Sequence, residues 1–191
     1  MTIKILVFAG SARASSLNKK LARVAAEAVR AAGASATFID LADYPIPLYD
    51  GDLEDREGLP ANARKLKDLF IAHQGLFIVS PENNASVSAL LKNTLDWLSR
   101  QVGSESGLVP YQGKVAAIAG ASPGMLGGLR GLTHLRAILQ TLRVLVLSEQ
   151  FALGHAEQAF NQDGSLKDAT QQAALAALAA RLVEVGTKLG A

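Results

Sequence analysis

The feature that most constrains this chain is an apolar run near the N-terminus that ends abruptly in a small, polar segment. Residues 3–9 read Ile-Lys-Ile-Leu-Val-Phe-Ala, with a single lysine among apolar side chains. An apolar run of this kind, without polar alternation, predicts a strand buried on both faces. Such strands occur in parallel sheets, so the rest of the chain must supply neighbouring strands and helices that cover both faces.

The polar segment at residues 10–18 has the composition of an anion-binding turn. It contains three hydroxyls, one guanidinium and one amide, and it leads into an Ala-rich helical stretch. Unpaired main-chain N–H groups at a helix N-terminus offer a phosphate both hydrogen-bond donors and a favourable field. The side chains that could add charge-assisted or neutral hydrogen bonds are Ser11, Arg13, Ser15, Ser16 and Asn18. Ser and Asn before a helix are also ordinary capping residues, and the turn alone leaves both interpretations open.

This turn matches neither of the two commonest phosphate loops. It lacks G-x-x-x-x-G-K-[ST], so no lysine and hydroxyl are placed for a triphosphate and its Mg²⁺. It also lacks the G-x-G-x-x-G fingerprint of dinucleotide sites. The composition suits a single terminal monophosphate.

Composition sets the class of protein. The 191 residues suit one domain, 1–191, and 49% hydrophobic with 19% charged residues is typical of a globular chain. The absence of cysteine excludes disulfides, thiolate catalysis and Cys-ligated metals. A net charge of +2 without basic clusters argues against nucleic-acid binding. The first strand leaves no room for a signal peptide and no apolar run reaches membrane-spanning length, so we expect a cytoplasmic protein with no membrane association.

Strand and helix patterns alternate along the chain. We expect strands at 3–9, 36–41, 75–80, 114–120 and 144–147, helices at 19–32, 60–73, 86–100, 128–142 and 168–189, and a long surface loop at 44–58. This order predicts a flavodoxin-like three-layer α/β/α sandwich with a five-stranded parallel sheet of order 2-1-3-4-5. Ligands in such sheets bind outside the carboxyl ends of strands 1, 3 and 4.

Unusual chemistry follows each of those three strands. After the third comes a polar stretch in which Asn83 and Asn84 offer amide donors and acceptors to a flat heterocycle, or else form an Asx turn before the next helix. After the fourth, residues 120–128 contain four glycines, which permit close backbone approach to a planar ligand or positive φ angles. Asp96 and Trp97 are expected to be structural.

Two of these loops also carry a family resemblance. G-S-x-R-x-x-S-x-N at 10–18 and P-E-x-N-x-S-x-x-x-x-L-K-N-x-x-D-W at 81–97 resemble the NADPH-dependent FMN reductase family, which includes quinone, chromate and azo-dye reductases. The resemblance extends to I-P-L-Y-D at 46–50 and S-P-G-M-L-G-G at 122–128, and so from the first strand to about Gly154.

The resemblance implies FMN as cofactor, NADPH or NADH as hydride donor, a small-molecule electron acceptor, and a homodimer or homotetramer. It implies that the FMN phosphate is held by Ser11, Arg13, Ser16 and Asn18, with Ser15 and Leu17 lining the turn. It places Pro81, Glu82, Asn83 and Asn84 beside the isoalloxazine, with Ser122 and Gly124 contacting it from the glycine-rich loop.

One position departs from the family pattern. The family usually has Tyr where this chain has Asn83. Loss of that apolar wall removes about 1–2 kcal/mol if the ring is largely buried, so we expect weaker flavin retention or a more polar acceptor pocket.

The flavin carries the chemistry in such enzymes, so no general acid, general base or metal ligand is expected. Glu82 is interpreted as hydrogen-bonding the main chain or positioning its loop. His73, His134 and His155 are interpreted as surface or capping residues on helix ends or faces away from the three loops. Of two other functions on this fold, the net charge disfavours an acidic electron carrier, and the absence of acidic residues after strand one disfavours a receiver domain. A non-enzymatic binding module that has lost its reductase activity remains an alternative.

Overall fold

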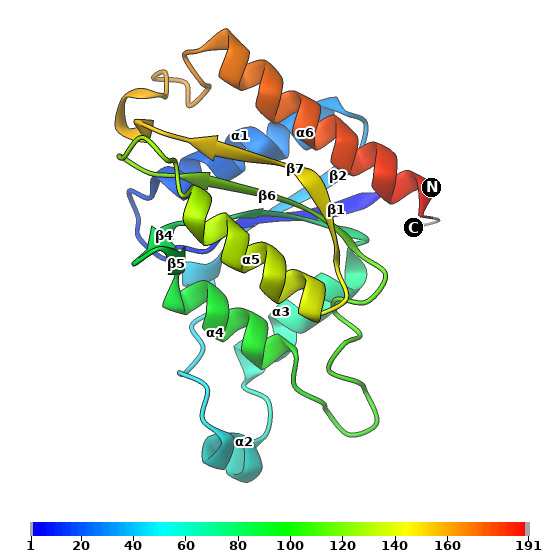
Figure 1. The fold of residues 1–191 in the computed structure, drawn as a ribbon. Coiled ribbons are helices and arrows are strands. Elements are labelled where there is room, and N and C mark those ends of the chain that lie inside the picture. Colours follow the sequence, from blue (N-terminus) through cyan, green and yellow to red (C-terminus); the bar gives the residue numbers. More distant parts are fainter. Residues whose placement is uncertain (1, 190–191) are drawn as a thin grey trace.

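The structure, a computed structural model, describes residues 2–189, and its main element is one parallel sheet. The strands of this sheet are β1 (Lys4–Ala9), β2 (Ser35–Asp40), β3 (Gly75–Val79), β6 (Val115–Ala121) and β7 (Leu145–Leu153). Their spatial order is β2-β1-β3-β6-β7. Figure 1 shows the sheet between layers of helices, with β1, β2, β6 and β7 labelled. The predicted order of 2-1-3-4-5 is therefore confirmed, because β6 and β7 are the fourth and fifth strands of the sheet in chain order.

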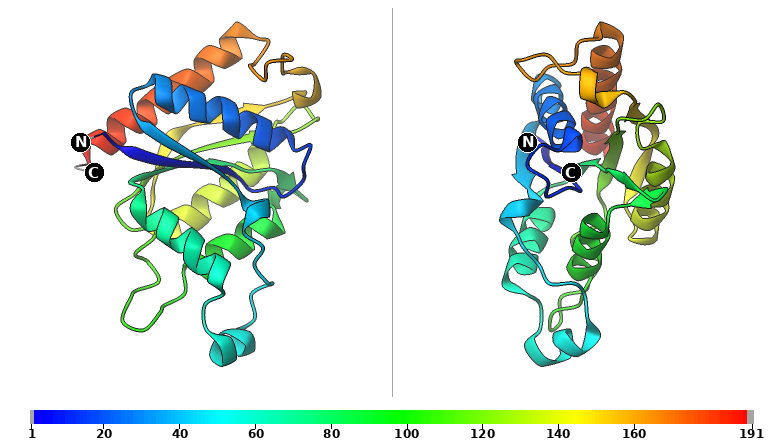
Figure 2. Two further views of the ribbon diagram at one scale, coloured as in Figure 1. Left: turned by 180° about the vertical axis from the view of Figure 1, so that it is seen from behind. Right: turned by 90° about the vertical axis from the view of Figure 1, so that its left-hand side faces the viewer.

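Helices cover both faces of this sheet (Figure 2). The helices are α1 (Leu17–Ala31), α2 (Gly51–Glu57), α3 (Ala61–Ala72), α4 (Ala89–Leu98), α5 (Leu129–Thr141) and α6 (Ala169–Lys188), with short 3-10 turns η1 (Leu41–Asp43) and η2 (Ala156–Gln158). α1 and α6 pack on one face, and α3, α4 and α5 pack on the other. Within residues 2–189, no helix combines the length and apolar character that crossing a membrane requires.

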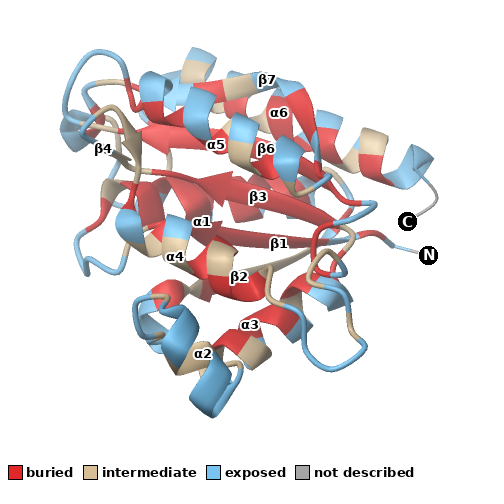
Figure 3. Ribbon diagram, turned by 60° about the horizontal axis from the view of Figure 1, so that its bottom comes forward, coloured by how far each residue is buried: buried red, intermediate tan, exposed pale blue. Residues whose placement is uncertain are grey.

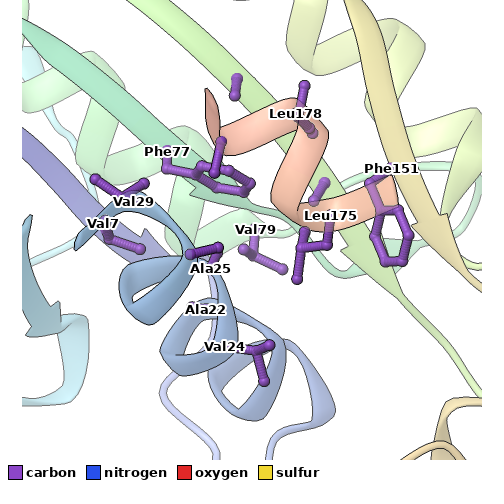
Figure 4. Packing of buried hydrophobic residues seen from close by; sticks show 14 of the residues in the cluster. Val7, Ala22, Val24, Ala25, Val29, Phe77, Val79, Phe151, Leu175 and Leu178 are labelled. Carbon is purple, nitrogen blue, oxygen red and sulfur yellow. The ribbon is translucent and has the colours of Figure 1, made fainter. Parts of the chain in front are cut away.

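The alternation of side chains along the central strands explains the three layers. In β1, Ile5 and Val7 face the α1/α6 side, and Leu6 and Phe8 face the α3/α4/α5 side. All four side chains are fully buried, as are most central-strand residues (Figure 3). Figure 4 shows the first of the two cores, in which side chains of α1 and α6 meet those of β1 and β3.

The three central strands end at the same level. Ala9 pairs with Val79, and Val79 pairs with Ala119 two residues before the end of β6. The loops that follow β1, β3 and β6 therefore emerge side by side at the carboxyl edge of the sheet, where the winding direction changes between β1 and β3.

The structure corrects the predicted elements in three places. The surface loop at 44–58 contains α2, which has no buried residue and projects from the body of the molecule (Figure 1). The predicted helix at 86–100 begins only at Ala89, because 82–87 form a hairpin of β4 (Glu82–Asn83) and β5 (Ser86–Val87). The last strand is longer than predicted because its pairing with β6 continues beyond a bulge.

Candidate flavin-binding cleft

The loop after β1 is organised by its own side chains. The Arg13 Nε donates to the Ser15 Oγ at 3.0 Å, and the Arg13 main-chain N–H donates to the Ser11 Oγ at 3.4 Å. Ser16 is the N-cap of α1, and its Oγ accepts from the Lys19 N–H at 3.3 Å. Of the two interpretations left open by the sequence, capping is observed at Ser16, and the polar side chains around it leave anion binding a prediction.

This arrangement has a consequence for hydrogen bonding. The hydroxyl oxygens of Ser11, Ser15 and Ser16 each accept an internal N–H. No hydroxyl proton of the three has an internal acceptor among residues 2–189, and no carboxylate of that range pairs with Arg13. The loop therefore presents three O–H donors and one guanidinium, beside the unpaired N–H groups of the first turn of α1. A donor set of this kind suits an anion with several oxygens.

Asn18 has a structural role that the sequence did not reveal. Its amide is buried, and it donates to the Ala121 carbonyl and accepts from the Ala121 N–H, both at 2.9 Å. This amide therefore joins the first turn of α1, which follows β1, to the last residue of β6, although β3 separates β1 from β6 in the sheet. Lys19 is likewise engaged, because its Nζ pairs with Asp40 at 2.7 Å.

The loop after β3 is fixed at both ends. Ser88 is the N-cap of α4, and its hydroxyl also donates to the Gly10 carbonyl at 2.6 Å, which ties this loop to the first one. Glu82 is directed to the N-terminus of α5, where it accepts from the Arg130 and Gly131 N–H groups. Burial raises the pKa of the Glu82 carboxyl, but the hydrogen bonds from Gly131 and Arg130 outweigh it and hold that pKa below its ordinary value. The prediction that Glu82 positions its loop agrees with this geometry.

Glycines in the third loop allow its main chain to fold closely on itself. Gly127 has a φ of 60°, and a Cβ there would lie 2.6 Å from the main chain of Ala152. A Cβ on Gly120 would lie 2.8 Å from the Gly127 carbonyl. The positive φ considered from sequence explains Gly127, and tight packing against neighbouring main chain, which the sequence did not indicate, applies at both positions. A Cβ on Gly124 would make only an ordinary contact, 3.8 Å from the Ser122 Oγ, so packing does not require glycine there.

These three loops border one cavity of about 750 Å³, a volume within the range of small-molecule sites. All but two of the predicted site residues line it: Ser11, Arg13, Ser15, Ser16, Leu17, Asn18, Pro81, Glu82, Asn83 and Ser122. Asn84 and Gly124 do not. Asn84 occupies the turn of the β4–β5 hairpin with a φ of 50°, and the Gly124 carbonyl instead accepts from Ser122 and from the His155 N–H.

Several lining residues were not predicted: Ser88, Ala89, Leu90, Ala121, Pro123 and Glu157. Glu157 lies in η2 beyond β7, and no local motif marks it, because its proximity depends on the pairing of β7 with β6.

The histidines are only partly where we expected them. His73 lies away from the cleft, and burial, the largest effect, lowers its pKa. His134 and His155 do not lie away from the three loops. The His134 Nδ1 is 2.9 Å from the Ser86 Oγ of the hairpin, and the His155 N–H donates to Gly124. No group of three or more metal-ligating side chains occurs in the described part of the chain.

A second hollow, of about 550 Å³, lies along α1 and is lined by Lys20, Arg23, Glu27, Phe38 and Asp163. It lies away from the carboxyl ends of the three central strands. The cleft at the strand ends is the better candidate because it combines size, unpaired donors and the topological switch point.

Comparisons with known proteins agree with this geometry. The family model described as NADPH-dependent FMN reductase matches residues 3–158. The quinone reductase of Escherichia coli K12 is 36% identical over 152 residues, which cover 80% of this chain and 77% of that protein. A 2-hydroxy-1,4-benzoquinone reductase of a Burkholderia species is 34% identical over 167 residues, covering 87% of this chain and 86% of the relative. Among solved structures, the flavoenzyme NAD(P)H:(acceptor) oxidoreductase FerB of Paracoccus denitrificans superposes with a TM-score of 0.82 at 28% identity, with 98% of each chain covered.

The fold and the cleft are those of a flavodoxin-like oxidoreductase whose cofactors are FMN and a reduced nicotinamide. The chain belongs to the NADPH-dependent FMN reductase family, over a match that includes all three loops of the cleft.

Proposed function

We propose that this protein, as one FMN-binding domain of residues 1–191, uses NAD(P)H to reduce quinone-type acceptors through FMN. The observation that carries the proposal is the donor set of the first loop. Ser11, Ser15 and Ser16 have accepted their internal hydrogen bonds and still offer O–H protons, and Arg13 has no carboxylate partner among the described residues. Together with the first turn of α1, these groups fit the terminal phosphate of FMN.

The residues of the cleft bind and orient the flavin. Bound FMN supplies the redox chemistry, since it accepts a hydride from the nicotinamide and passes electrons to the acceptor. The first loop would hold the phosphate, and Pro81, Asn83 and Ser122 would border the ring. Asn18 and Ser88 hold the three loops at fixed separations through their main-chain hydrogen bonds.

Charge favours a neutral acceptor over an oxyanion. Arg13 is the only lysine or arginine among the described residues that line the cleft. The FMN phosphate would pair with its guanidinium. Glu157 adds a carboxylate to the lining. A chromate ion would then find no free cation, whereas a quinone needs only access to the ring. We therefore rank quinones first among the acceptors, ahead of azo compounds, free flavins and chromate.

The assembly we propose is a homodimer or homotetramer. Large apolar side chains are exposed on the glycine-rich loop and at the start of α5, where Met125, Leu126 and Leu129 are 76%, 44% and 41% exposed. Apolar patches of this kind mark interaction surfaces. Light scattering of the purified protein gives the mass directly, and a monomer at micromolar concentration would contradict this assembly.

We place the enzyme in the cytoplasm, where reduced nicotinamides are supplied.

A steady-state assay tests the proposed activity. The FMN-loaded protein should oxidise NADPH or NADH faster with benzoquinone than with chromate or an azo dye at equal concentration. A protein that binds FMN but oxidises neither nicotinamide with any of these acceptors would instead be the binding module considered from the sequence.

A further inference from the structure

The β4–β5 hairpin cannot hold its own position. Each of its strands has two residues, and both turn residues, Asn84 and Ala85, have left-handed φ angles of 50° and 64°. An alanine in this conformation is strained, and isolated two-stranded hairpins are marginally stable at best. The hairpin nevertheless carries Asn83, which lines the cleft. Its orientation must therefore be set by contacts with the rest of the molecule.

Those contacts come from the first two turns of α5. The Glu82 carboxylate, 8% exposed, accepts from the Arg130 N–H at 3.0 Å, the Gly131 N–H at 3.1 Å and the Arg130 Nε at 2.7 Å. On the second strand, the Ser86 Oγ lies 2.9 Å from the His134 Nδ1. Both strands of the hairpin are thus attached to one helix.

The hairpin packs closely against the helix at Gly131, where a side chain would press on the hairpin. A Cβ on Gly131 would lie 3.0 Å from the Ser86 carbonyl and 3.4 Å from the Glu82 side chain. Neither Glu82 oxygen is left without an N–H donor, so the carboxylate is committed to α5.

We infer that Glu82 and Arg130 form a latch that fixes the ring-side wall of the cleft, so that Glu82 is a positioning residue and not a flavin ligand. Because α5 directly follows the glycine-rich loop, the latch also holds the second and third loops of the cleft as one unit. This inference rests on the proposed function for its effect on flavin, but the latch itself exists without a cofactor.

The first test needs no flavin. In E82Q, the new amide must turn its NH₂ toward either Arg130 or the N–H groups of α5. We expect hydrogen exchange of residues 82–88 in the apo protein to rise about tenfold, since charge-assisted hydrogen bonds are lost. R130M keeps the hydrogen bonds of Glu82 to the main chain of α5, so the hydrogen exchange of residues 82–88 should rise less. R130M replaces E82Q in this test if E82Q does not fold. E184Q is the matched control, because Glu184 pairs with Arg181 on the outer side of α6.

The second test measures binding of FMN and of riboflavin, which lacks the phosphate. E82Q should weaken both by the same factor, about tenfold, because the ring-side wall has lost its support. E184Q should change neither the exchange nor the binding. Unchanged exchange at 82–88 in both latch variants would overturn the latch, and faster exchange with unchanged flavin affinities would overturn its positioning role. A wild-type protein that binds neither flavin would refute the proposed function, while the exchange experiment would still decide the latch.

Discussion

Arg13 and Asn18 show what side-chain geometry adds to a motif. Both were predicted from sequence to hold a phosphate, and both line the cleft. The Arg13 side chain donates a hydrogen bond to Ser15 of its own loop, whereas the Asn18 amide bonds to the main chain of Ala121. The residue types of the loop identify a polar turn, but the partner of Asn18 lies in a strand 103 positions away and could not be read from the loop.

Replacement of Arg13 by alanine should weaken FMN binding by a factor of about ten or more. The change removes the only guanidinium of the cleft and its charge-assisted hydrogen bonds to phosphate. Fluorescence titration of the apo protein measures the effect. Arg56→Ala, which removes one exposed arginine from α2, is the control and should bind FMN like the wild type. Equal affinities for wild type and Arg13→Ala would show that Arg13 does not contact the phosphate.

We predict that replacing Ala85 by glycine makes the folded protein more stable. Its φ of 64° costs an alanine roughly 1–2 kcal/mol, whereas glycine adopts it freely at an entropic cost of about 0.5–1 kcal/mol. Ala85→Gly should therefore raise the free energy of unfolding by about 0.5–1 kcal/mol. Urea denaturation measures this, with Ala173→Gly in α6 as a control that should lose a similar amount. A loss of stability in Ala85→Gly would contradict the strain.

At the scale of elements, charge pairs hold the part of the molecule that projects from the sheet. Lys67 of α3 is fully buried and pairs with Glu105 at 2.8 Å, and Arg64 pairs with the same carboxylate. Arg100 in turn binds Glu54 of α2 at 2.8 Å. The hydrogen bonds from Arg64 and Lys67 hold the pKa of the Glu105 carboxyl below its ordinary value.

Glu105→Gln should destabilise the protein by about 1–2 kcal/mol at pH 7, because Lys67 would lose its counter-charge while Glu105 itself is partly exposed. A carboxyl whose folded-state pKa is lowered stabilises the fold above its unfolded pKa and ceases to do so as the pH falls through the folded value. The difference between wild type and variant should therefore shrink below about pH 4.5. Thermal unfolding against pH checks this, with Glu57→Gln on α2 as control. A difference that stays constant into acid would contradict the ion pair.

The elements that sequence predicted well are those with long apolar periodicity. β1, β3 and β6 and the five longest helices came from buried patterns that local composition already contains. α2 was missed because none of its residues is buried, so that it has no apolar stripe to recognise. The extension of β7 was missed because Arg136 stabilises its bulge by donating to the carbonyls of Leu147 and Ser148, a contact that no local pattern indicates.

At the scale of the whole molecule, the position of the cleft follows from topology. Right-handed crossovers on an order of β2-β1-β3-β6-β7 bring three loops to one edge, whatever their sequences. The sequence could therefore predict at which edge of the sheet the cleft lies and which loops line it. It could not predict Glu157 or the exclusion of Asn84, since these depend on the reach of β7 and on a tight hairpin turn.

The central claim is that this cleft binds FMN through its phosphate. Parallel titrations of the apo protein with FMN and with riboflavin test this claim most directly. We predict that FMN binds at least about 100-fold more tightly, because riboflavin leaves the guanidinium and the three hydroxyls without an anion. Arg13→Ala should reduce the ratio of the two affinities, because it weakens the binding of FMN and leaves that of riboflavin unchanged. Equal affinities of the wild-type protein for the two flavins, or no affinity for either, would contradict the account.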